Sequence, residues 1–360
     1  MGVPTMIPNL FPLPVTPKRV REALAECSVP RIAVVMPAYR VGRRPLALIA
    51  RMPASVGWIF VVDDACPEGS GDEVARHCVD PRVQVLRHDA NQGVGGAVVT
   101  GYQAALQTPA EAVVKLDGDG QMDPDLIDRL AAPVLARRAD YNKGNRFHQV
   151  SDVRRMPRIR LLGNAWLSFL SKLSTGYWQL FDPTNGFTAI HRDVLEQLPL
   201  PFLARRYFFE SDLLFRLGQL RAVVHEMPMP AVYDDEPSSL RPLQQIWPFL
   251  RGHGRNLLRR IVYDYLLRGF SMASVQLLLG LALLGGGGAF GLWQWIDHAA
   301  RGVTASAGTV MLAALPVLIG MQCLLAWLAH DMAAWPREPI CADTPPKDPP
   351  IAVRPAAEIS

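Results

Sequence analysis

The chain has 360 residues, of which 49% are hydrophobic and 19% are charged. That hydrophobic share excludes an intrinsically disordered chain, because such chains bury too little apolar surface to fold. A formal net charge of +4 is too small to predict a nucleic-acid partner. The five cysteines form no C-x-x-C pair, which argues against a disulfide scaffold or a structural zinc site and favours a reducing compartment.

Residues 1–30 are predicted to form an N-terminal extension to the first domain. The first 16 residues carry four prolines and lack a basic segment followed by an apolar one. They therefore do not have the pattern of a signal peptide.

Between Arg31 and Pro230, short β-branched runs alternate with longer helical patterns. The predicted strands are Ile32–Met36, Trp58–Val62, Val83–Leu86 and Ala112–Leu116. The two clearest helices between and after them are Gly95–Leu106 and Pro124–Arg138. This alternation predicts an α/β fold with a mostly parallel sheet. In such sheets ligands bind beyond the carboxyl ends of the strands, so the residues after each strand are candidate site residues.

Residues 241–268 are rich in arginine and aromatic side chains, and they are predicted to form amphipathic helices at a membrane surface. Residues 158–173 carry an apolar face beside a basic cluster and are interpreted in the same way. Residues 269–296 and 302–329 are each 28 residues long without Asp, Glu, Lys, Arg or His. As a helix, each would be about 42 Å long, enough to cross a bilayer.

The arginines before residue 269 outnumber the single arginine in the predicted connection at 297–301. By the positive-inside rule, residues 1–268 are expected to be cytoplasmic, and the spans to form a hairpin in the inner (plasma) membrane. Residues 330–360 are then a cytoplasmic, Pro-rich tail, predicted to be disordered.

Asp117 and Asp119 directly follow a predicted strand. In an extended segment, side chains at i and i+2 point the same way, so both carboxylates can face one ligand. A few carboxylates together with substrate phosphate oxygens are how Mg²⁺ or Mn²⁺ is usually held. An ordinary acidic turn is the alternative, since Asp-Gly pairs are common turn formers.

A Gly-rich loop containing Asn91 and Gly93 opens the helix at 95–106. Its glycine spacing matches neither a dinucleotide fingerprint nor an NTPase phosphate loop, but a helix N-terminus can hold part of a nucleotide-sugar. Gly101 is predicted to serve tight packing of the helix on the sheet. Asp123, followed by Pro124, is predicted to be a helix N-cap and not a ligand.

Glu210 and Asp212 begin another helical stretch. Residues at i and i+2 do not share a helix face, so only one of these acids is expected to reach the site. Glu210 is the favoured candidate, although first-turn acids can also simply complement the helix dipole.

Taken together, these segments resemble family 2 glycosyltransferases, which have a GT-A fold. The resemblance rests on VVMPAY, VVDD, NQGVGGA, KLDGDGQMDP, KGNRF, DPTNGFTAI and YFFESDLLFRL, within residues 31–240. More narrowly, the chain is similar to the dolichol-phosphate mannosyltransferase-like branch, whose bacterial members glycosylate undecaprenyl phosphate. Basic juxtamembrane helices and a two-span hairpin are also typical of that branch.

The resemblance implies roles for individual residues. Pro37, Tyr39 and Asp64 would line the nucleoside pocket, and Asp117, Asp119 and Gln121 would hold the metal and diphosphate. Arg146 would meet a phosphate of donor or acceptor. Asp182 and Glu210 would border the acceptor.

The implied activity is inverting, metal-dependent transfer of one sugar from a nucleoside-diphosphate sugar to polyprenyl phosphate. Two alternatives stay open: a transferase acting on a glycan or lipid-linked hydroxyl, with Glu210 or Asp212 as base, and a non-catalytic nucleotide-sugar-binding protein. Membrane lipid is an expected partner. The oligomeric state is also open, with a homo-oligomer among the alternatives.

Overall fold

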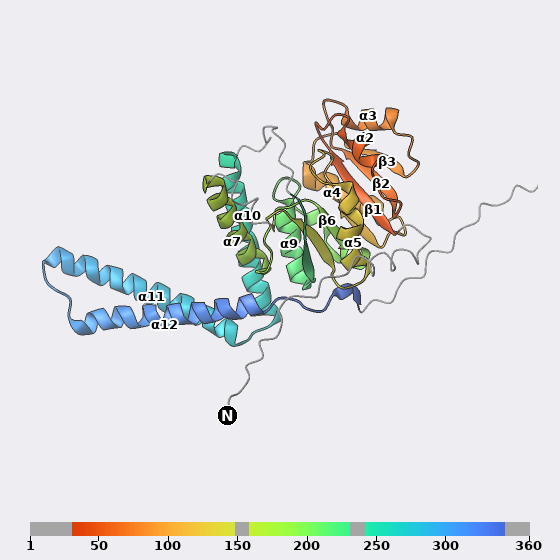
Figure 1. Cartoon of the computed structure of the whole chain (residues 1–360). Helices are drawn as coiled ribbons and strands as arrows, with labels where there is room; N and C mark the ends of the chain where they lie inside the picture. Colours follow the sequence, from red (N-terminus) through yellow and green to blue (C-terminus); the bar gives the residue numbers. More distant parts are fainter. Residues whose placement is uncertain (1–30, 148–157, 231–241, 343–360) are drawn as a thin grey trace, which may run out of the picture.

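The computed structural model describes residues 31–147, 158–230 and 242–342 (Figure 1). The predicted N-terminal extension, residues 1–30, lies outside the described residues, as does the tail beyond residue 342.

A seven-stranded sheet forms the centre of the α/β domain, in the order β3-β2-β1-β4-β6-β5-β7. Its strands are β1 (Ile32–Ala38), β2 (Val56–Asp63), β3 (Val83–Arg87), β4 (Ala112–Lys115), β5 (Tyr141–Asn145), β6 (Thr188–His191) and β7 (Val224–Pro228). All neighbouring pairs are parallel except those made by β6, which runs antiparallel to β4 and β5. The predicted mostly parallel α/β fold is therefore confirmed.

Helices cover both faces of this sheet. On one face lie α4 (Val94–Ala105), α8 (Arg192–Gln197), η2 (Leu200–Phe202) and α9 (Phe209–Leu220). On the other lie α2 (Arg44–Ile49), α3 (Ser70–His77), η1 (Pro124–Leu126) and α5 (Ile127–Leu135). Each face is apolar because buried strands alternate their side chains between the two layers.

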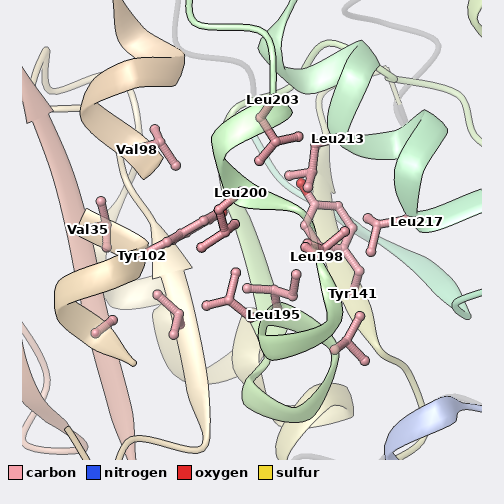
Figure 2. Close-up of a cluster of buried hydrophobic side chains, with 14 of the residues drawn as sticks. Val35, Val98, Tyr102, Tyr141, Leu195, Leu198, Leu200, Leu203, Leu213 and Leu217 are labelled. Atoms are coloured by element: carbon pink, nitrogen blue, oxygen red, sulfur yellow. The ribbon is translucent and has the colours of Figure 1, made fainter. Parts of the chain in front are cut away.

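Figure 2 shows the core on the α4 and α9 face, where Tyr102 and Tyr141 stand among leucines of α8, η2 and α9. Gly101 of α4 confirms its predicted packing role, since a Cβ there would lie 2.2 Å from Cγ1 of Val35. Asp123 also caps as predicted, because its side chain accepts a hydrogen bond from the amide of Asp125.

Two long amphipathic helices stand beside the domain and lie next to each other: α7 (Arg158–Thr175) and α10 (Pro242–Arg260), the latter continued by a π-helical segment, η3 (Ile261–Arg268). They expose large apolar side chains, among them Trp166 on α7 (59% exposed) and Trp247 on α10 (72% exposed). Exposed tryptophans at this density are unusual for a water-facing surface and suit a membrane interface.

Two apolar helices, α11 (Met272–Arg301) and α12 (Ala307–Ala333), pack against each other and project away from the α/β domain (Figure 1). Both are long and apolar enough to cross a membrane, and little of either is buried within the protein. The predicted connection at 297–301 is wrong. Helix α11 continues through these residues, with an Asp297–Arg301 ion pair, and ends at Gly302, so the turn is 302–306.

The base of this hairpin is joined to the α/β domain through Asp331, which is 2% exposed. Its carboxylate accepts hydrogen bonds from Arg260 and Tyr265, and from the indole N–H of Trp178 at 2.7 Å. A buried carboxylate with three donors is well satisfied, so this junction fixes α12 against α10 and η3.

The chain after α12 returns to the α/β domain. The short helix η4 (Ile340–Ala342) places the backbone N–H groups of Ile340 and Cys341 on the carboxylate of Asp140, at 3.0 and 2.9 Å. Asp140 is fully buried, and its remaining donor is the amide of Val223. The predicted disordered tail beginning at residue 330 is therefore wrong for 330–342, because a buried carboxylate recruits this segment.

Candidate active site

The candidate site lies at the edge of the sheet where every strand except β6 ends. Since β6 is antiparallel, its N-terminus and the loop before it come to the same edge. The residues gathered there come from five segments: Pro37 in the last residues of β1 with Tyr39 just after it, Asp64 after β2, Asp117–Gln121 after β4, Arg146 after β5, and Asp182–Phe187 before β6. The N-terminus of α9, with Glu210, closes the group.

Lys115, the last residue of β4, connects two of the predicted acids. Its ammonium donates to Asp117 Oδ1 at 2.7 Å and lies 3.4 Å from Glu210 Oε1, although the lysine itself is 1% exposed. Opposite charges outweigh burial here and raise the pKa of Lys115. Gly186 provides the room, because a Cβ there would lie 2.5 Å from the Lys115 Nζ and 2.8 Å from Asp117 Oδ2.

Asp119 follows in a turn, not in the extended segment that the sequence predicted. Its carboxylate accepts from the amide of Gln121 at 3.0 Å. Burial and the negative charge of Asp117 raise the pKa of Asp119. The two carboxylates therefore repel each other, and a divalent cation between them would relieve that repulsion.

No group of three or more His, Cys, Asp or Glu side chains capable of holding a metal exists in the described ranges. A metal at this edge would rest on Asp117, Asp119 and the side-chain oxygen of Gln121, with substrate phosphates as further ligands. That ligand set is the kind Mg²⁺ and Mn²⁺ accept.

The two acids of α9 point to different places, as the helical spacing predicts. Glu210 faces Lys115. Asp212 is fully buried elsewhere, where it accepts hydrogen bonds from the amide of Ala204 and the side chain of Asn256. Of the two acids, Glu210 is therefore the one that lies near Asp117 at this edge, and its role in the reaction stays a prediction.

Arg146 and Asp182 form a two-pronged ion pair. The guanidinium donates to both carboxylate oxygens, at 2.8 and 3.1 Å, and Asp182 is fully buried. Burial alone would raise the pKa of Asp182, but hydrogen bonds and charge from Arg146 outweigh it and lower that pKa. Glu226 of β7 holds the loop from below, since its carboxylate accepts from the amides of Phe181 and Asp182.

The Gly-rich loop is held by the protein itself. The amides of Gln92 and Gly93 donate to the carboxylate of Asp64, at 2.8 and 2.7 Å, and the Asn91 side chain donates to the Asp64 carbonyl. Gly96 donates to the carbonyl of Arg205. These donors face protein oxygens and do not form an open phosphate cradle. Nucleotide contacts of Asn91, Gly93 and Asp64 stay predictions.

The end of β1 lies against the acidic turn. The amide of Gly118 donates to the Pro37 carbonyl at 3.3 Å, and a Cβ at Gly118 would lie 3.0 Å from the same oxygen. Tyr39 is 41% exposed, with the Arg40 guanidinium 5.4 Å from its ring centroid. An exposed ring beside the acidic turn is suited to stacking on a base.

Sequence reasoning missed three charged residues at this edge: Lys115, Lys143 of β5 and Glu226 of β7. All three lie within buried or half-buried strands. A charged residue inside a buried strand was the available signal, because such positions are almost never charged unless paired or functional.

Comparison with known proteins agrees with this geometry. The profile described as Glycosyl transferase family 2 matches residues 34–199. The chain is 30% identical to an undecaprenyl-phosphate mannosyltransferase of Micrococcus luteus, over 56% of this chain and 84% of that protein. It is 31% identical to a polyprenol monophosphomannose synthase of Mycolicibacterium smegmatis, over 55% of this chain and 76% of that protein.

A third relative is a UDP-N-acetylglucosamine–dolichyl-phosphate N-acetylglucosaminyltransferase of Methanococcus voltae. It is 30% identical over 43% of this chain, and the match spans only 61% of that protein.

Among solved structures, the fold is similar to glucosyl-3-phosphoglycerate synthase from Mycobacterium tuberculosis, crystallised with Mn²⁺, UDP and phosphoglyceric acid. The TM-score is 0.50 at 19% identity, covering 67% of this chain and 82% of that one. This likeness concerns the fold alone. With the curated relatives, the sheet and the acids at its edge, it leads to one conclusion: the chain is a glycosyltransferase of family 2 and belongs to the polyprenyl-phosphate branch of that family.

Proposed function

We propose that this enzyme transfers a single sugar from a nucleoside-diphosphate sugar to the phosphate of a polyprenyl phosphate, with inversion at the anomeric carbon. The supporting observation is the pairing at one sheet edge of Asp117 and Asp119 with the Arg146–Asp182 ion pair. The first pair suits the metal-bound diphosphate of a donor, and the second borders a place for an anionic acceptor.

In the proposed reaction an acceptor phosphate oxygen attacks the anomeric carbon. The bond from that carbon to the donor's diphosphate oxygen breaks, and the diphosphate leaves with the electron pair. A divalent ion held by Asp117, Asp119 and Gln121 would supply neutralisation of the leaving diphosphate. A phosphate monoester is already ionised near pH 7, so no proton has to be removed from the nucleophile.

Glu210 then has a different task from a general base. Its carboxylate lies against Lys115, which also holds Asp117. We infer that Glu210 fixes the ammonium of Lys115, and through it the orientation of Asp117. For a hydroxyl acceptor, by contrast, a base would have to take up the proton.

Membrane attachment suits a lipid acceptor. We propose that α11 and α12 span the inner (plasma) membrane as a hairpin, with the catalytic domain cytoplasmic and α7 and α10 at the interface. Because η4 contacts the catalytic domain, both ends of the hairpin are on the side of that domain. The arginines before α11 favour the cytoplasm for that side.

A transfer assay tests the proposed reaction. Purified full-length protein is incubated with radiolabelled UDP- and GDP-sugars, with and without undecaprenyl phosphate, alongside the Asp119→Asn variant as the inactive control. We expect a product that partitions into organic solvent only when the lipid phosphate is present and that releases free sugar in mild acid. A water-soluble or acid-stable product formed without lipid phosphate would indicate the hydroxyl acceptor instead.

Reporter fusions test the topology. A reporter after Ser360 should be cytoplasmic, and one inserted within residues 302–306 should be exterior. A C-terminal reporter found outside would contradict the hairpin.

A further inference from the structure

Four polar residues form a row across the neighbouring strands β4, β6, β5 and β7. Lys115 of β4 is in register with Thr188 of β6, Thr188 with Lys143 of β5, and Lys143 with Glu226 of β7. Side chains of residues in register point to the same face of a sheet. The row therefore lies on the face covered by α4 and α9, where Glu210 begins α9.

The acids of this row and its surroundings have direct partners. Asp182 is paired with Arg146, and Glu210 lies beside Lys115. Glu226 accepts from the amides of Phe181 and Asp182 and from the side-chain amide of Asn145. Cations therefore balance Asp182 and Glu210, whereas Glu226 is satisfied by neutral N–H donors.

Lys143 differs from all of these. It is 1% exposed, and its ammonium makes no hydrogen bond and no ion pair within 4.0 Å to any residue that the structure describes. The carboxylates of Asp182, Glu226 and Glu210 act on it only from a longer distance. An ammonium buried without a direct partner is unfavourable, so Lys143 lowers the stability of the unliganded protein.

We propose that Lys143 binds the phosphate monoester of the lipid acceptor, beside Arg146. This inference rests on the proposed function and adds a residue to it. A phosphate monoester carries a charge of about −1.5 to −2 at pH 7, more than one cation balances. Arg146 is already engaged by both oxygens of Asp182, so its guanidinium alone leaves most of that charge unbalanced. Lys143, three residues earlier in the chain and inside β5, supplies the second positive charge.

A structural role for Lys143 makes the opposite prediction for stability. If the lysine mainly balanced Asp182 and Glu226, its replacement by Met would destabilise the protein. If it awaits an anion, Lys143→Met removes an unpaired buried charge, and the unliganded protein should unfold at the same or a higher temperature.

The test uses full-length protein in detergent and two short-chain probes added in the same detergent, farnesyl phosphate and farnesol. Binding is measured by isothermal titration calorimetry for wild type, Lys143→Met and Lys143→Gln. The matched control is Lys172→Met, since Lys172 of α7 lies over the ring of Phe181 and outside the row. We expect the Kd for farnesyl phosphate to rise about 10- to 100-fold in both Lys143 variants and at most a few-fold in the control. Binding of farnesol, and of UDP or GDP with Mg²⁺, should not change.

Several outcomes would overturn the inference. Wild-type affinity of Lys143→Met for farnesyl phosphate would remove Lys143 from the acceptor site. Loss of nucleotide affinity alone would assign it to the donor, and a variant that melts earlier or fails to fold would assign it a structural role. A wild-type protein that does not distinguish farnesyl phosphate from farnesol, yet transfers sugar to a hydroxyl, would instead contradict the proposed function itself.

Discussion

At the end of β4, one lysine is shared by two acids, and Asp119 is left beside the like charge of Asp117. Around β5 and β7, the acids Asp182 and Glu226 are satisfied, and Lys143 has no direct partner in the part of the chain that the structure describes. The donor half of the edge thus has a deficit of positive charge, and the acceptor half has a buried ammonium with a deficit of direct partners. A site that joins a metal-bound diphosphate to an anionic acceptor would fill both deficits, and each prediction below changes one of them.

The largest effect is expected on the donor half. Asp119→Asn should reduce sugar transfer by at least about 10³-fold, because the charge that holds the cation is lost. The metal-free variant should melt no earlier than wild type, since repulsion from Asp117 is removed. Initial rates and thermal unfolding measure both effects. Asp125→Asn, an exposed acid paired with Arg51, is the control that should retain activity; full turnover of wild type in EDTA would contradict the metal assignment.

On the acceptor half, Arg146→Ala should lower stability by about 3–5 kcal/mol, because it leaves the fully buried Asp182 without its charged partner. Thermal unfolding in detergent measures the loss. Adding Asp182→Asn should recover part of it, since the uncompensated carboxylate is then gone. Equal destabilisation in the single and double variants would mean that the pair is not coupled.

Glu210→Gln separates the two acceptor classes. We expect transfer to fall by at most about 10²-fold, with an unchanged pH profile, because the phosphate nucleophile arrives ionised. The rate is followed from pH 5 to 9 in wild type and variant. A loss of 10⁴-fold or more, with a lost acidic limb in the profile, would identify Glu210 as a general base.

The smallest effect concerns stability at high pH. Burial lowers the pKa of Lys143 to about 8, while the carboxylates of Asp182, Glu226 and Glu210 oppose this shift and Arg146 adds to it. Between that value and the ordinary 10.5, the unfolded chain binds the additional proton, so the free energy of unfolding should rise with pH. We expect up to about 3 kcal/mol across this window in wild type relative to Lys143→Met. If the free energy of unfolding depended on pH in the same way in both proteins, Lys143 would not be the group that titrates in this window.

Local patterns were enough to predict the first four strands, the parallel sheet, the cap at Asp123 and the packing of Gly101. Each depends on neighbours in sequence or on one face of one element. The row from Lys115 to Glu226 was not predictable in this way, because it depends on the register of four strands and on β6 entering antiparallel between β4 and β5. Likewise, the pattern of the Gly-rich loop did not reveal that Asp64 and Arg205 would take up its amides.

Asp140 receives two of its three backbone donors from residues 200 and 201 positions later in the chain. Protein synthesis proceeds from the N-terminus, so the catalytic domain emerges well before Ile340 and Cys341 exist. Until α11 and α12 have been made and the chain has come back, a buried carboxylate in the domain is short of donors, which is unfavourable. The domain therefore completes its own folding only after the α11–α12 hairpin has been made, and truncation within that hairpin should leave a less stable enzyme for the cell's proteases to remove.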